Sequence, residues 1–370
     1  MTLKLKATLF IITALTIPAG GPLSIAAQQK SVPEKLRSKV GSVFSAPVPH
    51  QKNIYFVSTA GVLFEADPEL KSVKKLYEGK KNTNGALTLS GDILYWGEGL
   101  DGDNSTILHS FDLKTKKSLR DLTIEGHVER PVLVSGDDLF VPMGSGGIAR
   151  FEKKTGKELW KTKTHASSAL HIDSNLIEYQ GQICGTSVGG IKGVICFDKA
   201  NGKESGFYEL KKDPKGRIGI SGDVLFGFAT EGNLIDPKFD LPSDFYVLDL
   251  KAKKMRFIKE LRGFNFFAPP VEGAEAFLTL STGDFILLNL ESQKITFLGE
   301  FPEPFINPSF RKDSEYCGIG IMGKFNCYSK TQNGAPAVSK DARILETVIG
   351  EVTLLNSKVY LPTRIGFVVQ

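Results

Sequence analysis

Two pairs of cysteines are the residues whose spacing most directly implies chemistry. Cys184 and Cys196 flank one glycine-containing segment, and Cys317 and Cys327 flank another. In each pair the midpoint falls on a predicted hairpin turn, so the two cysteines should face each other across antiparallel strands, at disulfide distance. We predict the disulfides Cys184–Cys196 and Cys317–Cys327; the alternative is four buried free thiols. Zinc binding is disfavoured because neither a CxxC spacing nor a nearby histidine accompanies them.

The remaining chemistry-bearing residues form no recognisable catalytic motif. There is no HExxH pair, no G-x-S-x-G elbow and no glycine-rich phosphate loop that precedes a helix. The sequence therefore predicts no catalytic residue, no metal and no cofactor. The histidines are scattered, and the six-residue separation of the last two matches no common ligand spacing: His50, His109, His127, His165 and His171.

An acidic insertion is the first candidate for binding a partner. Residues 230–244 form the longest insertion of the chain and contain Glu231, Asp236, Asp240 and Asp244 together with two prolines. Binding residues concentrate on loops that a rigid scaffold holds in place, so we interpret this segment as a recognition loop. The alternative is a tolerated, solvated insertion.

A short aromatic segment is the second candidate. Arg262, Phe264 and Phe267 lie close together in a predicted connection between repeats. For binding, the two phenylalanines would serve as apolar anchors beside a positive charge. The alternative, which we favour, is that they pack in the core.

A third loop carries oxygen-bearing side chains. Residues 100–106 include Asp101 and Asp103, and oxygen ligands are what calcium prefers. The spacing matches no EF-hand, and no glutamate stands at the position of a bidentate ligand. A solvated turn is the favoured interpretation.

Composition excludes several classes of protein. The chain has 370 residues, of which 41% are hydrophobic and 24% are charged, which is ordinary for a large globular fold. Disordered tails, collagen-like fibres, disulfide-dense miniproteins and polytopic membrane proteins are thereby ruled out. The formal net charge of +5 is small for this length, so nucleic-acid binding is not expected.

The N-terminus has the three-part pattern of a secretory signal. Lys4 and Lys6 precede an apolar run over residues 9–17, and small residues then offer a cleavage site near Ala27. The run is shorter than the roughly 20 residues that a membrane span needs. We predict that residues 1–27 are a cleaved signal peptide and that residues 28–370 form one periplasmic or secreted domain without a transmembrane segment. Export to an oxidising compartment also favours the two disulfides.

Two landmarks recur along the predicted domain at intervals of about 40 to 50 residues, the period of a four-stranded propeller blade. Six strands end in an apolar residue followed by an acid or asparagine, at residues 64–65, 111–112, 151–152, 197–198, 248–249 and 288–289. Eight polar turns precede short apolar strands, at residues 51–53, 91–92, 136–138, 181–182, 222–223, 273–275, 313–315 and 356–358.

These repeats predict an all-β fold, a single β-propeller of eight blades, with seven as the alternative if one weak unit is not a full blade. The last unit lacks a fourth strand, and residues 31–40 precede the first unit with nothing to pair with. Pairing this segment into the last unit would close the ring with strands from both termini. The alternative for residues 31–40 is an unpaired tail.

Residues 148–160 resemble the quinoprotein-type (PQQ-like) repeat, which has a T-G pair followed by a tryptophan, here Thr155, Gly156 and Trp160. Residues 197–204 and 111–117 are similar, weaker copies. Such repeats occur in quinoprotein dehydrogenases and in the bacterial outer-membrane assembly factor B, an eight-bladed, non-enzymatic scaffold. The resemblance implies that the tryptophan packs between blades and that the glycine permits the turn.

The resemblance favours a scaffold over an enzyme. Quinoprotein dehydrogenases carry adjacent cysteines over the quinone, and this chain has none. The assembly factor is lipidated, but no cysteine follows the apolar run here. We therefore expect an exported, monomeric, non-enzymatic scaffold that binds another envelope or outer-membrane protein. A quinoprotein-like oxidoreductase and a glycan-binding surface adhesin are the alternatives, and the sequence does not identify the partner.

Overall fold

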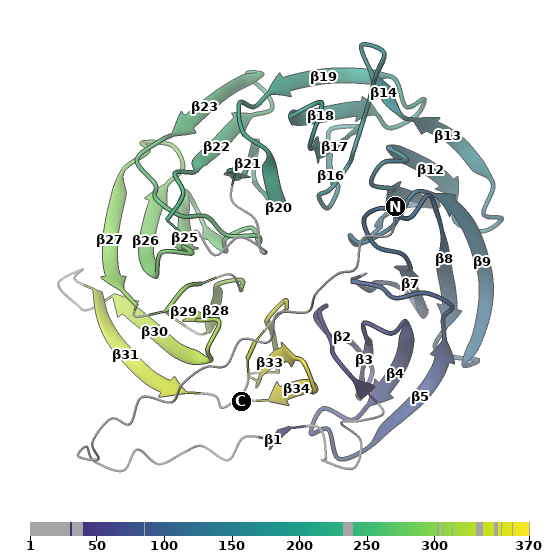
Figure 1. The fold of residues 1–370 in the computed structure, drawn as a ribbon, viewed down its shortest axis with the longest axis horizontal. Coiled ribbons are helices and arrows are strands. Elements are labelled where there is room, and N and C mark those ends of the chain that lie inside the picture. Colours follow the sequence, from purple (N-terminus) through teal and green to yellow (C-terminus); the bar gives the residue numbers. More distant parts are fainter. Residues whose placement is uncertain are drawn as a thin grey trace, which may run out of the picture.

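Eight four-stranded antiparallel sheets surround one central axis, as blades of a propeller (Figure 1). This structure is a computed structural model, and it describes residues 30–31, 40–84, 86–231, 240–301, 303–305, 307–312, 314–330, 336–343, 347–348, 350–356 and 358–369. Within these residues every named element is a strand. The predicted all-β, eight-bladed architecture is confirmed.

In blades 1 to 7 the strands follow one another in chain order from the axis outward (Figure 1). Blades 1 to 4 consist of β2 (Val48–His50), β3 (Asn53–Val57), β4 (Val62–Ala66) and β5 (Val73–Glu78); β6 (Thr88–Ser90), β7 (Ile93–Gly97), β8 (Ser105–Asp112) and β9 (Lys117–Glu125); β10 (Leu133–Ser135), β11 (Asp138–Pro142), β12 (Ile148–Glu152) and β13 (Glu158–Thr162); and β16 (Ile177–Tyr179), β17 (Gln182–Ser187), β18 (Gly193–Asp198) and β19 (Glu204–Glu209). A small hairpin of β14 (Thr164–His165) and β15 (Ser168–Ala169) connects blades 3 and 4.

Blades 5 to 8 repeat this order, and the last one takes a strand from the N-terminal side of the chain. They consist of β20 (Pro214–Ser221), β21 (Val224–Ala229), β22 (Asp244–Asp249) and β23 (Lys254–Ile258); β24 (Val271–Glu272), β25 (Glu275–Thr279), β26 (Asp284–Asn289) and β27 (Ile295–Glu300); β28 (Phe310–Lys312), β29 (Glu315–Ile319), β30 (Lys324–Lys330) and β31 (Pro336–Arg343); and β32 (Thr353–Leu355), β33 (Lys358–Thr363), β34 (Gly366–Val369) and β1 (Lys30–Ser31).

All eight predicted polar turns join the first strand of a blade to its second. In blades 2 and 3 the chain reverses there through a left-handed backbone, which Gly91 and Gly136 adopt with φ of 60° and 61°. Gln51 and Asn356 take the same conformation at the equivalent turns of blades 1 and 8, with φ of 53° and 50°. The residues that these turns require therefore account for the repeat of polar turns in the sequence.

Antiparallel pairing sorts the connections onto two faces of the ring. One face, which we call the loop face, carries the connections between second and third strands and those from each blade to the next. The opposite face, the turn face, carries the first-to-second and third-to-fourth turns. This division follows because successive strands of a blade run in opposite directions between the two faces.

The hydrophobic core lies between blades rather than inside one of them. Trp96 of blade 2 packs with Tyr55 and Leu63 of blade 1 in one buried cluster. Another cluster joins Phe367 of blade 8 to Phe56 of blade 1, with ring centroids 4.9 Å apart. A blade exposes two apolar faces, so it is stable only with a neighbour on each side.

The two ends of the chain close the ring in blade 8. Lys30 pairs with Val369 and Ser31 with Val368, so β1 forms the fourth strand of that blade. The predicted closure by both termini is confirmed. Of the predicted segment, Ser31 lies in the strand, while residues 32–39 lie outside the described residues.

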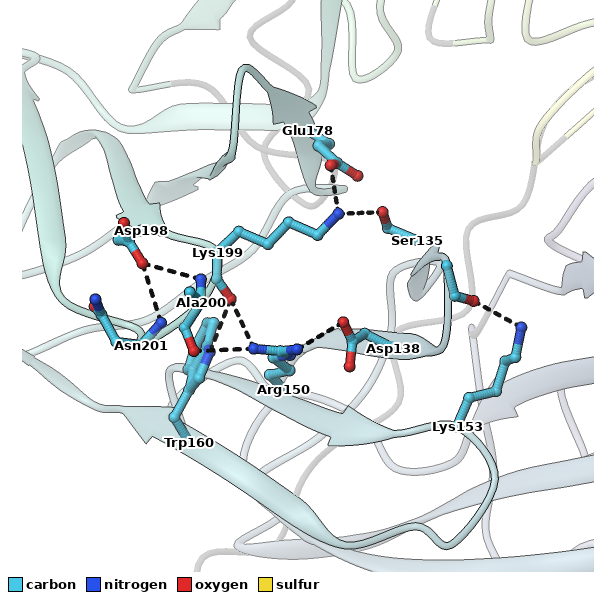
Figure 2. Close-up of polar contacts among 11 residues, drawn as sticks. Ser135, Asp138, Arg150, Lys153, Trp160, Glu178, Asp198, Lys199, Ala200 and Asn201 are labelled. Atoms are coloured by element: carbon cyan, nitrogen blue, oxygen red, sulfur yellow. Dashed lines mark hydrogen bonds and ion pairs between the residues drawn. The ribbon is translucent and has the colours of Figure 1, made fainter.

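The tryptophan of the repeat motif docks on the following blade, on the turn face (Figure 2). Trp160 of β13 donates from Nε1 to the carbonyl of Lys199, at 3.1 Å, in the turn after β18. That turn is held by Asp198, whose carboxylate accepts the backbone N–H groups of Ala200 and Asn201 at 2.9 and 3.1 Å. The Phe-Asp landmark at residues 197–198 thus shapes the turn that receives the neighbouring blade.

Two further side chains extend these contacts, one that binds the turn and one that belongs to it. Arg150 of β12 donates to the carbonyls of Lys199 and Ala200, at 3.3 and 2.9 Å, while its other nitrogen pairs with Asp138 (Figure 2). Lys199 reaches back between the blades, where its Nζ lies 2.5 Å from both Ser135 and Glu178. The result is a polar network across the junction of blades 3 and 4.

The same docking contact recurs at two other junctions with arginine in place of tryptophan. Arg120 on β9 donates to the carbonyl of Lys154 in the next blade, at 2.7 Å. Arg256 on β23 donates to the carbonyls of Leu290 and Glu291, at 3.4 and 3.3 Å. All of these acceptors belong to third-to-fourth-strand turns. At these junctions the fourth strand of one blade supplies a side-chain donor, and the third-to-fourth-strand turn of the following blade supplies the carbonyl acceptors.

Both predicted disulfides are present. Cys184 faces Cys196 across β17 and β18, and Cys317 faces Cys327 across β29 and β30, with Cα atoms 4.1 Å apart in each case. All four side chains are buried. The bridges occupy the same pair of strands in blades 4 and 7.

We expect Trp160 and Gly202 to be energetically coupled. A Cβ at Gly202 would lie 2.5 Å from Cδ2 of Trp160, whereas one at Gly136 would meet nothing within 4 Å. Both glycines have positive φ, so alanine at either costs about 1–2 kcal/mol in backbone strain. Gly202→Ala should cost about 1–3 kcal/mol more, through overpacking.

Urea unfolding of the variants measures this coupling. In a Trp160→Ala background the extra cost of Gly202→Ala should disappear, while the cost of Gly136→Ala stays the same. Strictly additive losses for Trp160→Ala and Gly202→Ala would contradict the proposed contact.

Ring closure should depend on the backbone of β1. Neighbouring N–H groups of an antiparallel strand point to opposite sides, so one of Lys30 and Ser31 donates to β34. Proline at both positions removes that hydrogen bond, which costs about 0.5–1.5 kcal/mol. Alanine at both positions keeps the donors and serves as the control. We expect denaturant unfolding to show a loss for the proline variant only. Equal stability of the two variants would argue against the pairing.

Removing one disulfide should lower the free energy of unfolding. The cysteines of the pairs are 12 and 10 residues apart, so each bridge closes a short loop worth about 2–3 kcal/mol. The double variant Cys184→Ala/Cys196→Ala, unfolded without reductant, should show this loss. Unchanged stability, together with two titratable thiols in the wild-type protein, would refute the bridge.

Candidate functional site

The loops singled out in the sequence lie on the loop face. The acidic insertion follows the second strand of blade 5, and residues 262–267 lie in the connection from blade 5 to blade 6. The loop at residues 100–106 occupies the corresponding second-to-third-strand position in blade 2. One face of the ring thus gathers all three candidates.

The acidic insertion is anchored at both ends by lysines. Glu231 is exposed, and its carboxylate lies 3.5 Å from Nζ of Lys192. Asp244 is only 7% exposed, at the start of β22, and pairs with Lys212 at 3.2 Å. Asp244 is therefore a structural anchor rather than a free recognition group. Asp236 lies outside the described residues.

The insertion and the aromatic segment are joined along their backbones. An isolated antiparallel bridge pairs Pro242 with Arg262. The N–H of Gly263 donates to the carbonyl of Leu241 at 3.0 Å, and the N–H of Ser243 donates to that of Leu261 at 3.3 Å. Two segments about 20 residues apart therefore behave as one unit.

Asp240 and Arg262 line the same open cavity, which has a volume of about 540 Å³. Both side chains are exposed. Asp284 and Glu300 from blade 6 also line it, so the lining contains three carboxylates and one guanidinium. The remaining lining residues are Ser281, Thr282 and Pro304. The lining has a net negative charge, which suits a basic side chain.

Phe264 does not reach this cavity. It is fully buried in the cluster shared by blades 5 and 6, and its N–H donates to Ser281 Oγ at 2.9 Å. A partner has no access to its ring, so the core-packing alternative holds for this residue. Phe267 is partly buried, and Oδ1 of buried Asn265 accepts its N–H at 2.9 Å.

The two acids of the loop at residues 100–106 have different partners. Asp103 accepts the N–H of Leu100 at 2.9 Å and pairs with Lys81 at 2.9 Å, and these contacts hold its pKa below the usual range. Asp101 is bound instead through its N–H by Glu129, at 2.6 Å. The carboxylates do not converge, and the solvated-turn interpretation fits better than a calcium loop.

A buried histidine lies between two carboxylates in blade 2. His109 is 1% exposed, 2.7 Å from Asp121 and 3.0 Å from Glu98, and it stacks on Trp96. Because the ring is enclosed, a substrate cannot reach it, and the contacts tie β8 to its neighbours. Sequence reasoning missed this group because its members come from separate segments: Glu98 follows β7, His109 lies in β8 and Asp121 in β9.

A second missed feature is an ion pair across the ring interior. Both guanidinium Nη atoms of Arg217, on β20, bind the two carboxylate oxygens of Glu351, which precedes β32, and one of these contacts is 2.5 Å. Burial lowers the pKa of Arg217, which Glu351 opposes and Arg130 reinforces. The residues are 134 positions apart and belong to non-adjacent blades, so no sequence signal indicates the contact.

The fold is that of an eight-bladed β-propeller. Residues 84–224 match a family model described as outer membrane protein assembly factor BamB, which confirms the resemblance inferred from the repeats. A search of curated proteins gives no match.

Solved structures share the fold at low sequence identity. BamB from Moraxella catarrhalis is 13% identical, with a TM-score of 0.68 over 88% of this chain and 95% of that one. The computationally designed Ika8 protein is 11% identical, with a TM-score of 0.69 over 89% and 96%. At these identities the similarities show a shared propeller fold.

Proposed function

We propose that this protein is an exported, non-enzymatic scaffold that binds another protein of the cell envelope, in the manner of an outer-membrane assembly factor. The observation that carries the proposal is the match of residues 84–224 to the assembly-factor family. Export is supported by the signal-like N-terminus and by the two buried disulfides, which persist in oxidising compartments. In the described residues, no helix is long and apolar enough to span a membrane.

The loop face between blades 5 and 6 is the proposed contact surface. Asp240 and Arg262 are exposed there, on backbones that hydrogen bonds hold in register. Loops held by a rigid scaffold lose little conformational entropy on binding, so charges at this place contribute to affinity and specificity. Asp284 and Glu300 favour a partner that inserts a lysine or arginine.

The experiment is photocrosslinking in intact cells from a probe at Asp240. Asp137 is exposed in a first-to-second-strand turn on the turn face, so it is the matched control position. We expect a reproducible adduct with one envelope protein from the probe at Asp240 and none from the probe at Asp137. Adducts only with abundant bystanders, or the same adducts from both positions, would refute the proposed surface.

Charge reversal gives a second measurement on the same surface. In the protein that carries the probe at position 240, Arg262→Glu removes the positive charge from the cavity and adds a carboxylate to those of Asp284 and Glu300. The yield of the adduct should therefore rise several-fold if the partner inserts a lysine or arginine. Asp137→Lys should leave it unchanged.

A further inference from the structure

Three side chains with metal-binding atoms meet on the loop face between blades 2 and 4. Asp101 comes from the β7–β8 loop, His127 from the connection between β9 and β10, and His171 from the connection between β15 and β16. One ligand atom of each lies within 4.8 Å of the others. The residues are 26 and 44 positions apart in the chain, so the cluster exists only in the folded ring.

We propose that Asp101, His127 and His171 bind one divalent transition-metal ion, with Zn²⁺ as the best fit. Two imidazole nitrogens and one carboxylate oxygen form the donor set that borderline metal ions prefer, whereas Ca²⁺ and Mg²⁺ prefer oxygen ligands alone. Three protein ligands leave at least one coordination position for water or for a side chain of a partner.

His127 is a buried ring that lacks a hydrogen-bond partner at one nitrogen. The residue is 2% exposed, and within the described part of the chain its Nδ1 atom has no donor or acceptor in reach. A buried unpaired nitrogen costs free energy unless a ligand or an ordered water satisfies it. The ring rests directly on Gly144, where a Cβ would come within 2.1 Å of Cε1. Its position is thus determined by packing before any ion arrives.

His171 is held by its backbone. Its N–H donates to Ser187 Oγ at 3.1 Å, and its carbonyl accepts the N–H of Val188 at 3.0 Å. The following residue, Ile172, donates its N–H to the carbonyl of Gly144 at 3.0 Å. Gly144 therefore contacts both histidine segments, through the ring of His127 and through the backbone beside His171. The centroids of the two rings lie 5.4 Å apart.

An ion pair fastens together the two connections that carry the histidines. Arg130, three residues after His127, donates from Nε and Nη2 to Oδ1 of Asp173, at 3.2 and 3.0 Å. Asp173 is two residues after His171. This contact limits relative motion of the two segments, which is what a preformed pair of ligands requires.

Asp101 is the adjustable ligand. Its side chain is 79% exposed, and Oδ1 lies 4.0 Å from Nε2 of His171. Bonds of about 2.0–2.2 Å to a tetrahedral ion need ligand atoms roughly 3.3–3.5 Å apart. A rotation of this exposed carboxylate can bring its oxygen to that distance from His171. Binding would tie blades 2, 3 and 4 together at the loop face.

The test is Zn²⁺ binding to the purified, tag-free, disulfide-intact protein by isothermal titration calorimetry. We expect one ion per chain at micromolar or tighter affinity. His171→Ala and Asp101→Asn should each weaken binding by more than about tenfold, since even changes beyond the direct ligands cost roughly 10- to 100-fold. His165→Ala is the matched control, because His165 lies in the same connection but pairs with Glu204 at 2.7 Å.

Co²⁺ provides a readout that loss of folding does not imitate. Bound Co²⁺ should show d–d absorption typical of a low-coordinate nitrogen and oxygen site, and the band should be lost in His171→Ala and kept in His165→Ala. Absence of stoichiometric binding, or equal loss in the control, would overturn the assignment. Because these measurements use the isolated protein, their failure is distinguishable from failure of the partner-binding proposal.

Discussion

Burial of apolar surface between blades is the interaction on which the rest of the structure depends. Each blade exposes two apolar faces, so no blade is stable until it has a neighbour on both sides. That requirement makes closure obligatory, and the pairing of β1 with β34 supplies it. The cluster that joins Phe367 to Phe56 shows the last blade packing on the first with the same aromatic chemistry used elsewhere.

Polar contacts then fix how neighbouring blades sit on one another. On the turn face, donors from Trp160, Arg120 and Arg256 reach carbonyls of the following blade. Carbonyl acceptors need no particular side chain, so different donors satisfy the same junction, which explains why the tryptophan is recognisable in one repeat only. These three contacts do not involve the connections of the loop face, which can therefore carry charged side chains.

The two proposed sites share a physical origin. Asp240 and Arg262 meet because the connection after blade 5 pairs with the insertion within that blade. Asp101, His127 and His171 meet because three loop-face connections converge there, and Gly144 of a fourth connection contacts the ring of His127. In both cases the strands of the blades hold the connections in place, and side chains of the connections form the proposed site. Arg217 and Glu351 add a link between non-adjacent blades through the interior.

The sequence favoured eight blades over seven, closure of the ring by both termini, and the two cysteine pairs, all of which the structure bears out. These features depend on local turn chemistry and on register within single hairpins, as in Cys184 facing Cys196. It left open whether Phe264 was an anchor or core, and it offered no sign that His127 and His171 lie near Asp101. Tertiary structure decided these points, because side chains from different blades meet only when the ring closes and burial depends on the neighbouring blade.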